Sequence, residues 1–248
     1  MIGKIAAKFG YRISRLTGPS DSGDPFRTMQ RLLIGTGEPI IFDVGAHHGH
    51  VSLEFRRRFP GSTIYAFEPF KGSFEKLQHN TASDPGIHAF NFGLSDQQGT
   101  LSFHSNPNSA TNSLLSTDLR GSKTWEPGLL ETEEVVQAQF KTVDQVLLDL
   151  GIPRLDILKL DVQGAEHLVI KGASSACQER KIRIAYSEVI TQPTYEDQKR
   201  LDQALAVFYD NGFDLFNIYN MNLADDGRLR QIDAIFTRTQ VDTPAGSI

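Results

Sequence analysis

Short apolar segments alternate with amphipathic stretches along most of the chain. The apolar segments have the length and composition of strands that are buried on both faces, and we place them at residues 39–44, 63–68, 87–92, 155–161 and 182–189. The amphipathic stretches predict helices at residues 48–59, 71–80, 142–151, 164–172 and 194–211, after a first helix that starts at Asp24. Strands that alternate with helices predict an α/β fold with a parallel sheet.

The pattern ends with two strands, residues 213–219 and 231–237, which a short polar loop joins. The loop has no room for a crossover helix, so these two strands are expected to pair antiparallel. We therefore predict a Rossmann-like sheet of seven strands that is mostly parallel, with an antiparallel last strand and helices on both faces.

Segments outside this alternation divide the chain. We assign residues 38–240 to one domain and residues 1–37 to an N-terminal helical extension and linker. Residues 1–16 repeat basic and apolar residues at helical spacing, which fits a helix docked on the domain or on a partner subunit, or one in weak contact with a membrane surface. A hairpin strand at residues 100–105 leads into a polar, poorly patterned segment, residues 105–139, which favours either a lid over the acceptor or a surface insertion without a role.

Composition narrows the class of protein. The net charge is −5 and the sequence pI is about 5.8, so we expect no nucleic-acid partner. Cys177 is the only cysteine and has no partner for an internal disulfide, which fits a reducing compartment. No apolar segment reaches the roughly 18 residues of a membrane span. These observations predict a cytoplasmic protein without a transmembrane segment, and they leave a homo-oligomer open.

The segment from residue 41 to residue 69 has the parts of a nucleoside-binding site. One strand ends at Asp43, a turn that runs from Gly45 to Gly49 opens a helix, and the next strand ends at Glu68. Glycines at such a turn let the backbone approach a ligand, and an acid at the end of the second strand accepts hydrogen bonds from a ribose diol. The sequence therefore predicts a nucleoside at this edge of the sheet.

The spacing within the turn separates two kinds of nucleoside. A dinucleotide-binding turn reads G-x-G-x-x-G, and its middle glycine leaves room for a pyrophosphate. His47 occupies that position, which favours S-adenosylmethionine, a cofactor without phosphates whose cationic sulfonium suits a nearby acid such as Asp43. A nicotinamide cofactor, and a turn that only packs a helix against a strand, are the alternatives.

Four motifs follow one another at suitable spacing: Asp43-Val-Gly-Ala-x-x-Gly, Phe67-Glu-Pro, Leu94-Ser-Asp-x-x-Gly, and Leu158 to Glu166 with Lys171-Gly172 after it. Together they resemble the FkbM family of methyltransferases over residues 38–190. The resemblance implies a class I methyltransferase sheet and an S-adenosylmethionine-dependent O-methyltransferase that acts on a hydroxyl of a sugar, glycan, glycolipid or related natural product. The candidate cofactor-binding residues are Asp43, Gly45, Ala46, His47, Gly49, Glu68, Pro69, Phe70, Leu94, Ser95 and Asp161.

The chain departs from the family pattern at three positions. The family usually has Asn in place of His47, an aromatic residue in place of His50 and Glu in place of Gln163. The third change removes a carboxylate beside Asp161, which puts in doubt a metal or acceptor role of that second acid and keeps a non-catalytic, cofactor-binding protein in view. No ligand spacing supports a metal site, so we predict none.

Methyl transfer to a sugar hydroxyl needs a base that takes the hydroxyl proton. Asp161, at the end of the central strand, is the first candidate, although orientation of the methionine amino group is an equal alternative for it. Glu188 ends the next strand and is the second catalytic candidate, in acceptor binding or proton relay. Histidine is a weaker candidate for the base, at position 48 or 104, and Lys159 is expected to pair with one of the acids at the strand ends.

Overall fold

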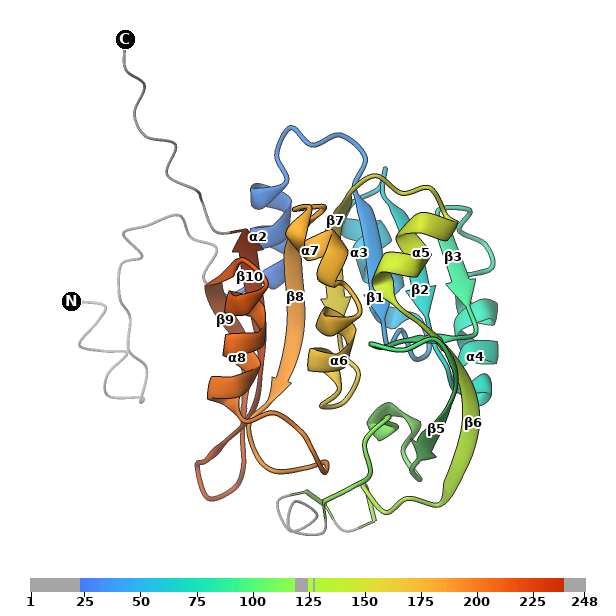
Figure 1. Ribbon diagram of the computed structural model, residues 1–248, viewed down its shortest axis with the longest axis vertical. Helices are drawn as coiled ribbons and strands as arrows, with labels where there is room; N and C mark the ends of the chain where they lie inside the picture. Colours follow the sequence, from blue (N-terminus) through green and yellow to red (C-terminus); the bar gives the residue numbers. More distant parts are fainter. Residues whose placement is uncertain (1–22, 119–124, 127, 239–248) are drawn as a thin grey trace, which may run out of the picture.

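The computed structural model describes residues 23–118, 125, 126 and 128–238. Its large sheet contains seven strands in the order β3-β2-β1-β7-β8-β10-β9 (Figure 1). The first five run parallel to one another, and β10 is antiparallel to both of its neighbours. The predicted sheet with its antiparallel last strand is therefore confirmed. Its strands are β1 (Ile40–Val44), β2 (Thr63–Phe67), β3 (Ile87–Phe90), β7 (Leu155–Leu160), β8 (Ile182–Ile190), β9 (Phe213–Leu223) and β10 (Leu229–Arg238).

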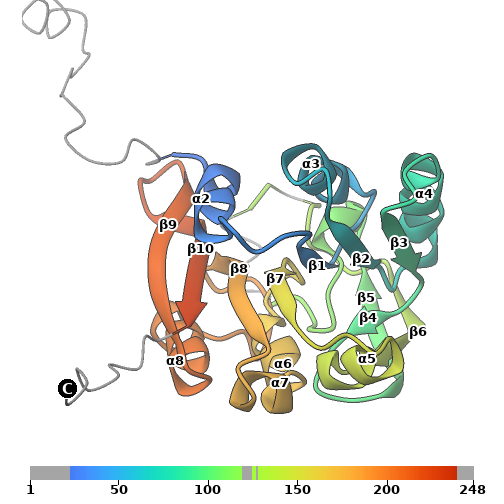
Figure 2. The same cartoon turned by 90° about the horizontal axis from the view of Figure 1, so that it is seen from above.

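Helices cover both faces of this sheet, as predicted (Figure 2). One face packs against α2 (Pro25–Leu32), α3 (His50–Arg58) and α4 (Lys71–Thr81), which bury apolar side chains such as Met29, Phe55 and Leu77. The other face packs against α5 (Val143–Asp149), α6 (Glu166–Lys171), α7 (Ser174–Gln178) and α8 (Leu201–Asp210). All six residues of β7 are buried because this strand lies in the middle of the sheet, between both layers of helices.

Local signals in the sequence predict several helix ends correctly. The Asp24 carboxylate accepts hydrogen bonds from the backbone N–H groups of Phe26 and Arg27 and thereby caps α2. The Thr142 hydroxyl accepts from the N–H of Gln145 at the start of α5, and Gly172 is the C-cap that follows the last residue of α6. These helix ends depend on neighbouring residues in the chain, which is why the sequence shows them.

A second, smaller sheet differs from the predicted hairpin. It contains β4 (Gly93–Leu94), β5 (Gly99–Ser105) and β6 (Glu134–Lys141), in the order β4-β6-β5. β5 pairs antiparallel with β6, whereas the sequence pattern predicts no strand at residues 134–139 and places the partner of β5 earlier in the chain. After β5, residues 106–118 include the short helix η1 (Ser109–Thr111) and lie beyond the carboxyl ends of the parallel strands of the large sheet (Figure 1).

The helix predicted over residues 194–211 begins only at Leu201. The Gln198 side chain accepts from the N–H groups of Thr194 and Tyr195 and donates to the carbonyl of Ile190. These bonds satisfy the backbone of an irregular segment that packs the buried Tyr195 against the segment between β5 and β6. Within the described part of the chain, no helix has the length and apolar character needed to cross a membrane. Residues 1–16, for which docking or membrane contact is predicted, lie outside the described residues.

Candidate active site

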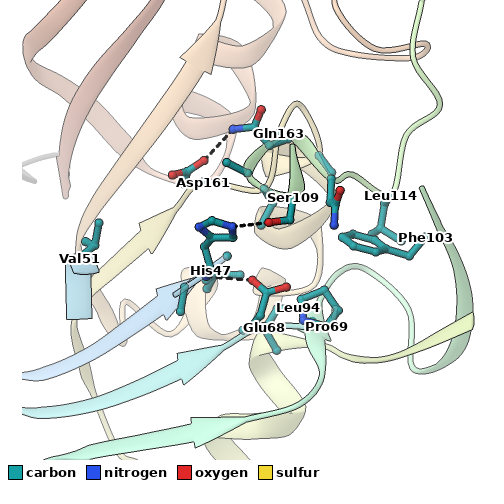
Figure 3. A pocket seen from close by; sticks show the side chains of 18 of the residues that line it. His47, Val51, Glu68, Pro69, Leu94, Phe103, Ser109, Leu114, Asp161 and Gln163 are labelled. Carbon is teal, nitrogen blue, oxygen red and sulfur yellow. Dashed lines mark hydrogen bonds between the residues drawn. The ribbon is translucent and has the colours of Figure 1, made fainter. Parts of the chain in front are cut away.

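A cavity of about 210 Å³ lies between the carboxyl ends of β1, β2 and β7 and the small sheet (Figure 3). The ends of these strands contribute Val44, Glu68 and Asp161 to its wall. The small sheet and η1 contribute Leu94, Phe103, Phe140 and Ser109. Ligands of open α/β sheets bind at this edge, so the cavity is the candidate cofactor site.

The glycine turn after β1 is fixed by the protein itself. Gly45 has a φ of +75°, and a Cβ atom on it would lie 1.9 Å from the carbonyl oxygen of Asp161. A Cβ on Gly49 would lie 2.8 Å from Cδ1 of Leu77 in α4. The sequence predicted that both glycines make room for a ligand. In the structure, the space beside each is filled by the chain, although Gly45 still lines the cavity.

His47 connects the glycine turn to η1, the short helix between β5 and β6. Its backbone N–H donates to Oε2 of Glu68 at 2.9 Å, and its ring Nε2 lies 2.8 Å from Oγ of Ser109 (Figure 3). Its φ of +49° is unusual for a residue with a side chain. Burial and the neighbouring His48, whose ring is stacked on it, lower the pKa of His47 to about 4. His47 is therefore neutral near pH 7 and closes one side of the cavity.

Glu68 lies at the position predicted for a ribose-binding acid. Its two carboxylate oxygens accept from the backbone N–H groups of His47 and Phe70, both at 2.9 Å, and these bonds fix its orientation. Burial raises its pKa to about 7. Glu68 lines the cavity, as do the predicted residues Ala46, Pro69 and Leu94.

Four predicted cofactor residues do not line the cavity: Asp43, Gly49, Phe70 and Ser95. The Asp43 carboxylate is fully buried, accepts from Oγ of Ser52 at 2.6 Å and pairs with Nζ of Lys159 at 2.9 Å. The partner expected for Lys159 is therefore Asp43. Ser95 Oγ instead lies 3.3 Å from an oxygen of Asp96, outside the cavity wall. Through Lys159, which lines the cavity, Asp43 supports the cavity wall from behind.

Gln163 connects the two predicted catalytic acids. Its Nε2 donates to Oδ1 of Asp161 at 2.9 Å and to Oε2 of Glu188 at 2.8 Å, and its Oε1 accepts from the Tyr195 hydroxyl at 3.0 Å. Gln231 donates to the other carboxylate oxygen of Glu188 at 3.0 Å. Burial and the nearby Asp161 raise the pKa of Glu188 well above its usual value.

A second cavity, of about 470 Å³, lies over the carboxyl ends of β7 and β8 and the start of the antiparallel strand β10. Val51, Lys159 and Asp161 line both cavities. Of these two cavities, Glu188 lines the second, together with Tyr186 and Asp233, which are not among the residues predicted from the sequence. Asp233 escapes prediction because only the pairing of β10 with β8 brings it opposite Glu188.

The apolar wall of the first cavity was also missed. Phe103, Leu114 and Phe140 come from β5, β6 and the segment between them. Alternation in residues 99–105 is the one signal that marks Phe103 as buried. His48 lines the cavity, whereas His104 does not. No group of three or more His, Cys, Asp or Glu side chains within the described ranges is arranged as a metal site.

Comparison with known proteins identifies the family. Residues 43–215 match the family model of the methyltransferase FkbM domain. Methyltransferase sdnD of Sordaria araneosa is 32% identical over 71% of this chain and 74% of its own, and 2-O-methyltransferase NoeI of Sinorhizobium fredii is 26% identical over 67% and 69%. Hexuronic acid methyltransferase AglP of Haloferax volcanii is 28% identical over 68% of this chain and 62% of its own. The chain belongs to the FkbM methyltransferase domain family, and it is an S-adenosylmethionine-dependent methyltransferase.

Proposed function

We propose that this enzyme transfers a methyl group to a hydroxyl of a saccharide or a related natural product. The observation that carries the proposal is the position of Asp161, which lines both cavities and so lies where a cofactor in one and an acceptor in the other would meet. Relatives support the acceptor class: one is named a 2-O-methyltransferase and another a hexuronic acid methyltransferase.

The first cavity suits S-adenosylmethionine because its two ends differ in polarity (Figure 3). Leu94, Phe103 and Leu114 form an apolar end that matches an adenine ring. Glu68 follows, with a carboxylate oriented to accept from ribose hydroxyls, and Asp161 lies at the polar end, where the cationic methionine part belongs. When bound, the cofactor supplies a methyl group that its sulfonium has already activated.

The second cavity is the proposed acceptor site. Its rim carries Asn220, Asn222 and Gln231, whose amides both donate and accept hydrogen bonds, and Phe26 adds an apolar surface. Such a mixture of amides, carboxylates and an aromatic ring suits a sugar. The insertion between β5 and β6, expected from the sequence to be a lid over the acceptor, instead lines the first cavity, the proposed cofactor site, through Ser109, Ala110 and Leu114, and none of its described residues lines the second.

Asp161 is the proposed base. A hydroxyl loses its proton as its oxygen attacks the methyl carbon, and a carboxylate within reach takes up that proton. The Gln163 amide and Lys159, whose Nζ is 3.6 Å from Oδ2 of Asp161, hold this carboxylate in place. Glu188 is held by the same amide on the acceptor side, where it binds the acceptor or relays the proton.

Replacement of Glu68 by Ala tests the cofactor site. Loss of hydrogen bonds to a charged acceptor predicts a decrease of about 1.5–3 kcal/mol in affinity for S-adenosylhomocysteine, measured by calorimetry. Glu75→Ala, on the exposed face of α4, is the matched control and should bind normally. Unchanged affinity in Glu68→Ala would remove the ribose assignment.

Replacement of Asp161 by Asn separates the two roles left open by the sequence. A base role predicts that kcat falls by about 100-fold or more while cofactor affinity changes little. An orienting role predicts the reverse, with weaker cofactor binding and nearly normal kcat.

Titration of the wild-type protein with NAD should show no binding, because the turn at His47 is not that of a dinucleotide site.

We also infer a cytoplasmic location from the single cysteine, and this inference can be tested by cell fractionation. Assembly into a homo-oligomer stays a prediction, for which light scattering of the purified protein is the measurement.

A further inference from the structure

The second cavity has an unusual balance of charge. Its described lining includes three carboxyl groups, those of Asp161, Glu188 and Asp233, and one cationic side chain, that of Lys159. The Lys159 ammonium is already committed, because it lies 2.9 Å from Oδ1 of Asp43 and donates to the carbonyl of Gly45 at 3.0 Å. An incoming ligand therefore meets an excess of carboxyl groups.

Two of these carboxyl groups face each other without an ion pair. Asp233 and Glu188 are direct partners in the antiparallel register of β10 and β8, an arrangement that destabilises a sheet. Their hydrogen-bond donors are neutral: Tyr186 and Asn220 donate to Asp233 at 2.8 and 2.7 Å, and Gln231 donates to Glu188. Burial, followed by the proximity of other carboxylates, raises the pKa of Glu188. The pKa of Asp233 is also raised, first by burial.

This arrangement does little for the fold. A neutral pair at these two positions would avoid the repulsion and would keep the sheet hydrogen bonds. Both side chains line a cavity beside Asp161, and their accepting oxygens are oriented by neutral donors. The oriented oxygens can accept hydrogen bonds from hydroxyl or amino groups, whereas the burial and mutual proximity that disfavour the charged forms of these acids equally disfavour a further carboxylate or phosphate in the cavity.

We infer that the cavity selects an acceptor whose methylated unit carries no carboxylate or phosphate, that is, a neutral or amine-bearing sugar or polyol. This inference rests on the proposed function and adds a charge requirement to it. It also distinguishes this chain from the relative that is named a hexuronic acid methyltransferase.

The test compares acceptors that differ only in charge. Methyl glycosides of glucose, galactose and mannose are assayed beside their 2-amino and uronic-acid counterparts, with labelled S-adenosylmethionine as the methyl source. We expect kcat/KM for the hexosides or the amino sugars to exceed that for the matched uronides by about 100-fold or more.

Substitution at Asp233 assigns the selectivity to this cavity. Asp233→Asn should reduce the preference about tenfold, and Asp233→Lys should abolish or reverse it, since each changes the charge that faces the acceptor. Asp214→Lys, on the exposed part of β9, changes the net charge of the molecule equally and should leave the preference unchanged. Asp233→Asn keeps the test decisive if the lysine variant does not fold.

The outcomes separate this inference from the proposed function. Equal methylation of uronides and hexosides would overturn the charge requirement and leave the proposed function standing. A preference that persists in folded Asp233→Asn and Asp233→Lys would overturn the assignment to this cavity. Binding of S-adenosylhomocysteine without methylation of any glycoside in the three series would contradict the proposed saccharide acceptor, and the charge requirement with it.

Discussion

The tightest contact in the glycine turn is at Gly45, which packs against the backbone of β7. A Cβ at this position would lie 1.9 Å from the Asp161 carbonyl oxygen, and a rigid strand end cannot move away. Its φ of +75° adds a backbone cost of roughly 1–2 kcal/mol for any L-residue with a side chain. The turn that shapes the cofactor cavity therefore depends on one residue without a side chain.

Gly45→Ala should reduce the free energy of unfolding by more than the backbone cost, by about 4 kcal/mol or more, because the clash adds to it. Gly35→Ala is the matched control, since Gly35 has a φ of +79° and a Cβ atom on it would meet nothing within 4 Å. Thermal denaturation of both variants measures the difference. Equal losses of stability would show that the contact with β7 relaxes without cost.

Gln163 acts at the residue scale as a neutral donor between two acids. Gln163→Glu replaces that donor by a third carboxyl group beside Asp161 and Glu188. We expect a loss of about 1–3 kcal/mol in unfolding free energy at pH 8, which becomes smaller toward pH 5 as the carboxyl groups take up protons.

The control for this prediction is Gln98→Glu, because Gln98 is exposed and hydrogen-bonds only to the amide of Gln145 among its described contacts. It adds the same charge with little expected effect. Denaturant titrations at pH 8 and pH 5 measure the unfolding free energy of both variants. A loss of stability in Gln163→Glu that does not depend on pH would contradict repulsion between carboxylates as its cause.

At the scale of elements, α2 depends on its cap. Asp24 accepts from two backbone N–H groups at the helix start, and its other oxygen pairs with Arg58 of α3 at 3.0 Å. Asp24→Ala should cost about 1 kcal/mol and lower the melting temperature by roughly 2–4 °C. Asp24→Asn retains the cap and loses the partly exposed ion pair, so it should lie close to wild type.

Local patterns allowed the sheet and most helices to be predicted from the sequence, since buried strands are apolar and caps are adjacent to their helices. Pairing between distant segments was not accessible in this way. β5 and β6 pair Phe103 with Val136, and only this long-range register marks residues 134–139 as a strand. The start of α8 depends likewise on a side chain, Gln198, that satisfies the preceding backbone.

Pairing between distant segments also explains why only part of the candidate site was predicted from the sequence. Glu68 and Asp161 were predicted to line the cofactor cavity because each ends a strand at the expected edge, and both do line it. Asp43 ends its strand at the same edge but lies beside Lys159 in the register of β1 and β7, which are far apart in the chain. The ion pair between these two residues keeps the Asp43 carboxylate out of the cavity wall.

At the scale of the whole molecule, acids with raised pKa values make stability depend on pH. Glu68 and Glu166 have pKa values raised to about 7, chiefly by burial, and the pKa values of Glu188 and Asp233 are also raised. In the unfolded chain, these groups lose their protons near pH 4. The folded protein therefore holds more protons than the unfolded chain from about pH 4.5 up to about pH 7, so raising the pH through this range destabilises it.

Histidines oppose this trend only at lower pH. The pKa of His47 is lowered to about 4, so its effect lies between about pH 4 and its unfolded value of 6.5, where stability rises with pH. Above pH 6.5, the pH dependence of stability comes mainly from the acids with raised pKa values. Each glutamate with a pKa of about 7 should then contribute a loss of roughly 1 kcal/mol between pH 6.5 and pH 8, because the folded state gives up its proton in that range.

The ligand-free enzyme should accordingly melt at a lower temperature at pH 8 than at pH 6.5, by roughly 3–8 °C for a domain of this size. Scanning calorimetry at constant ionic strength measures this shift. Glu166→Gln should reduce it by removing one of the groups that titrate, whereas Glu75→Gln, on the surface of α4, should not. A melting temperature that stays constant or rises from pH 6.5 to pH 8 would mean that Glu68 and Glu166 are already ionised in the folded protein at pH 6.5, with the backbone N–H groups that donate to them as sufficient partners.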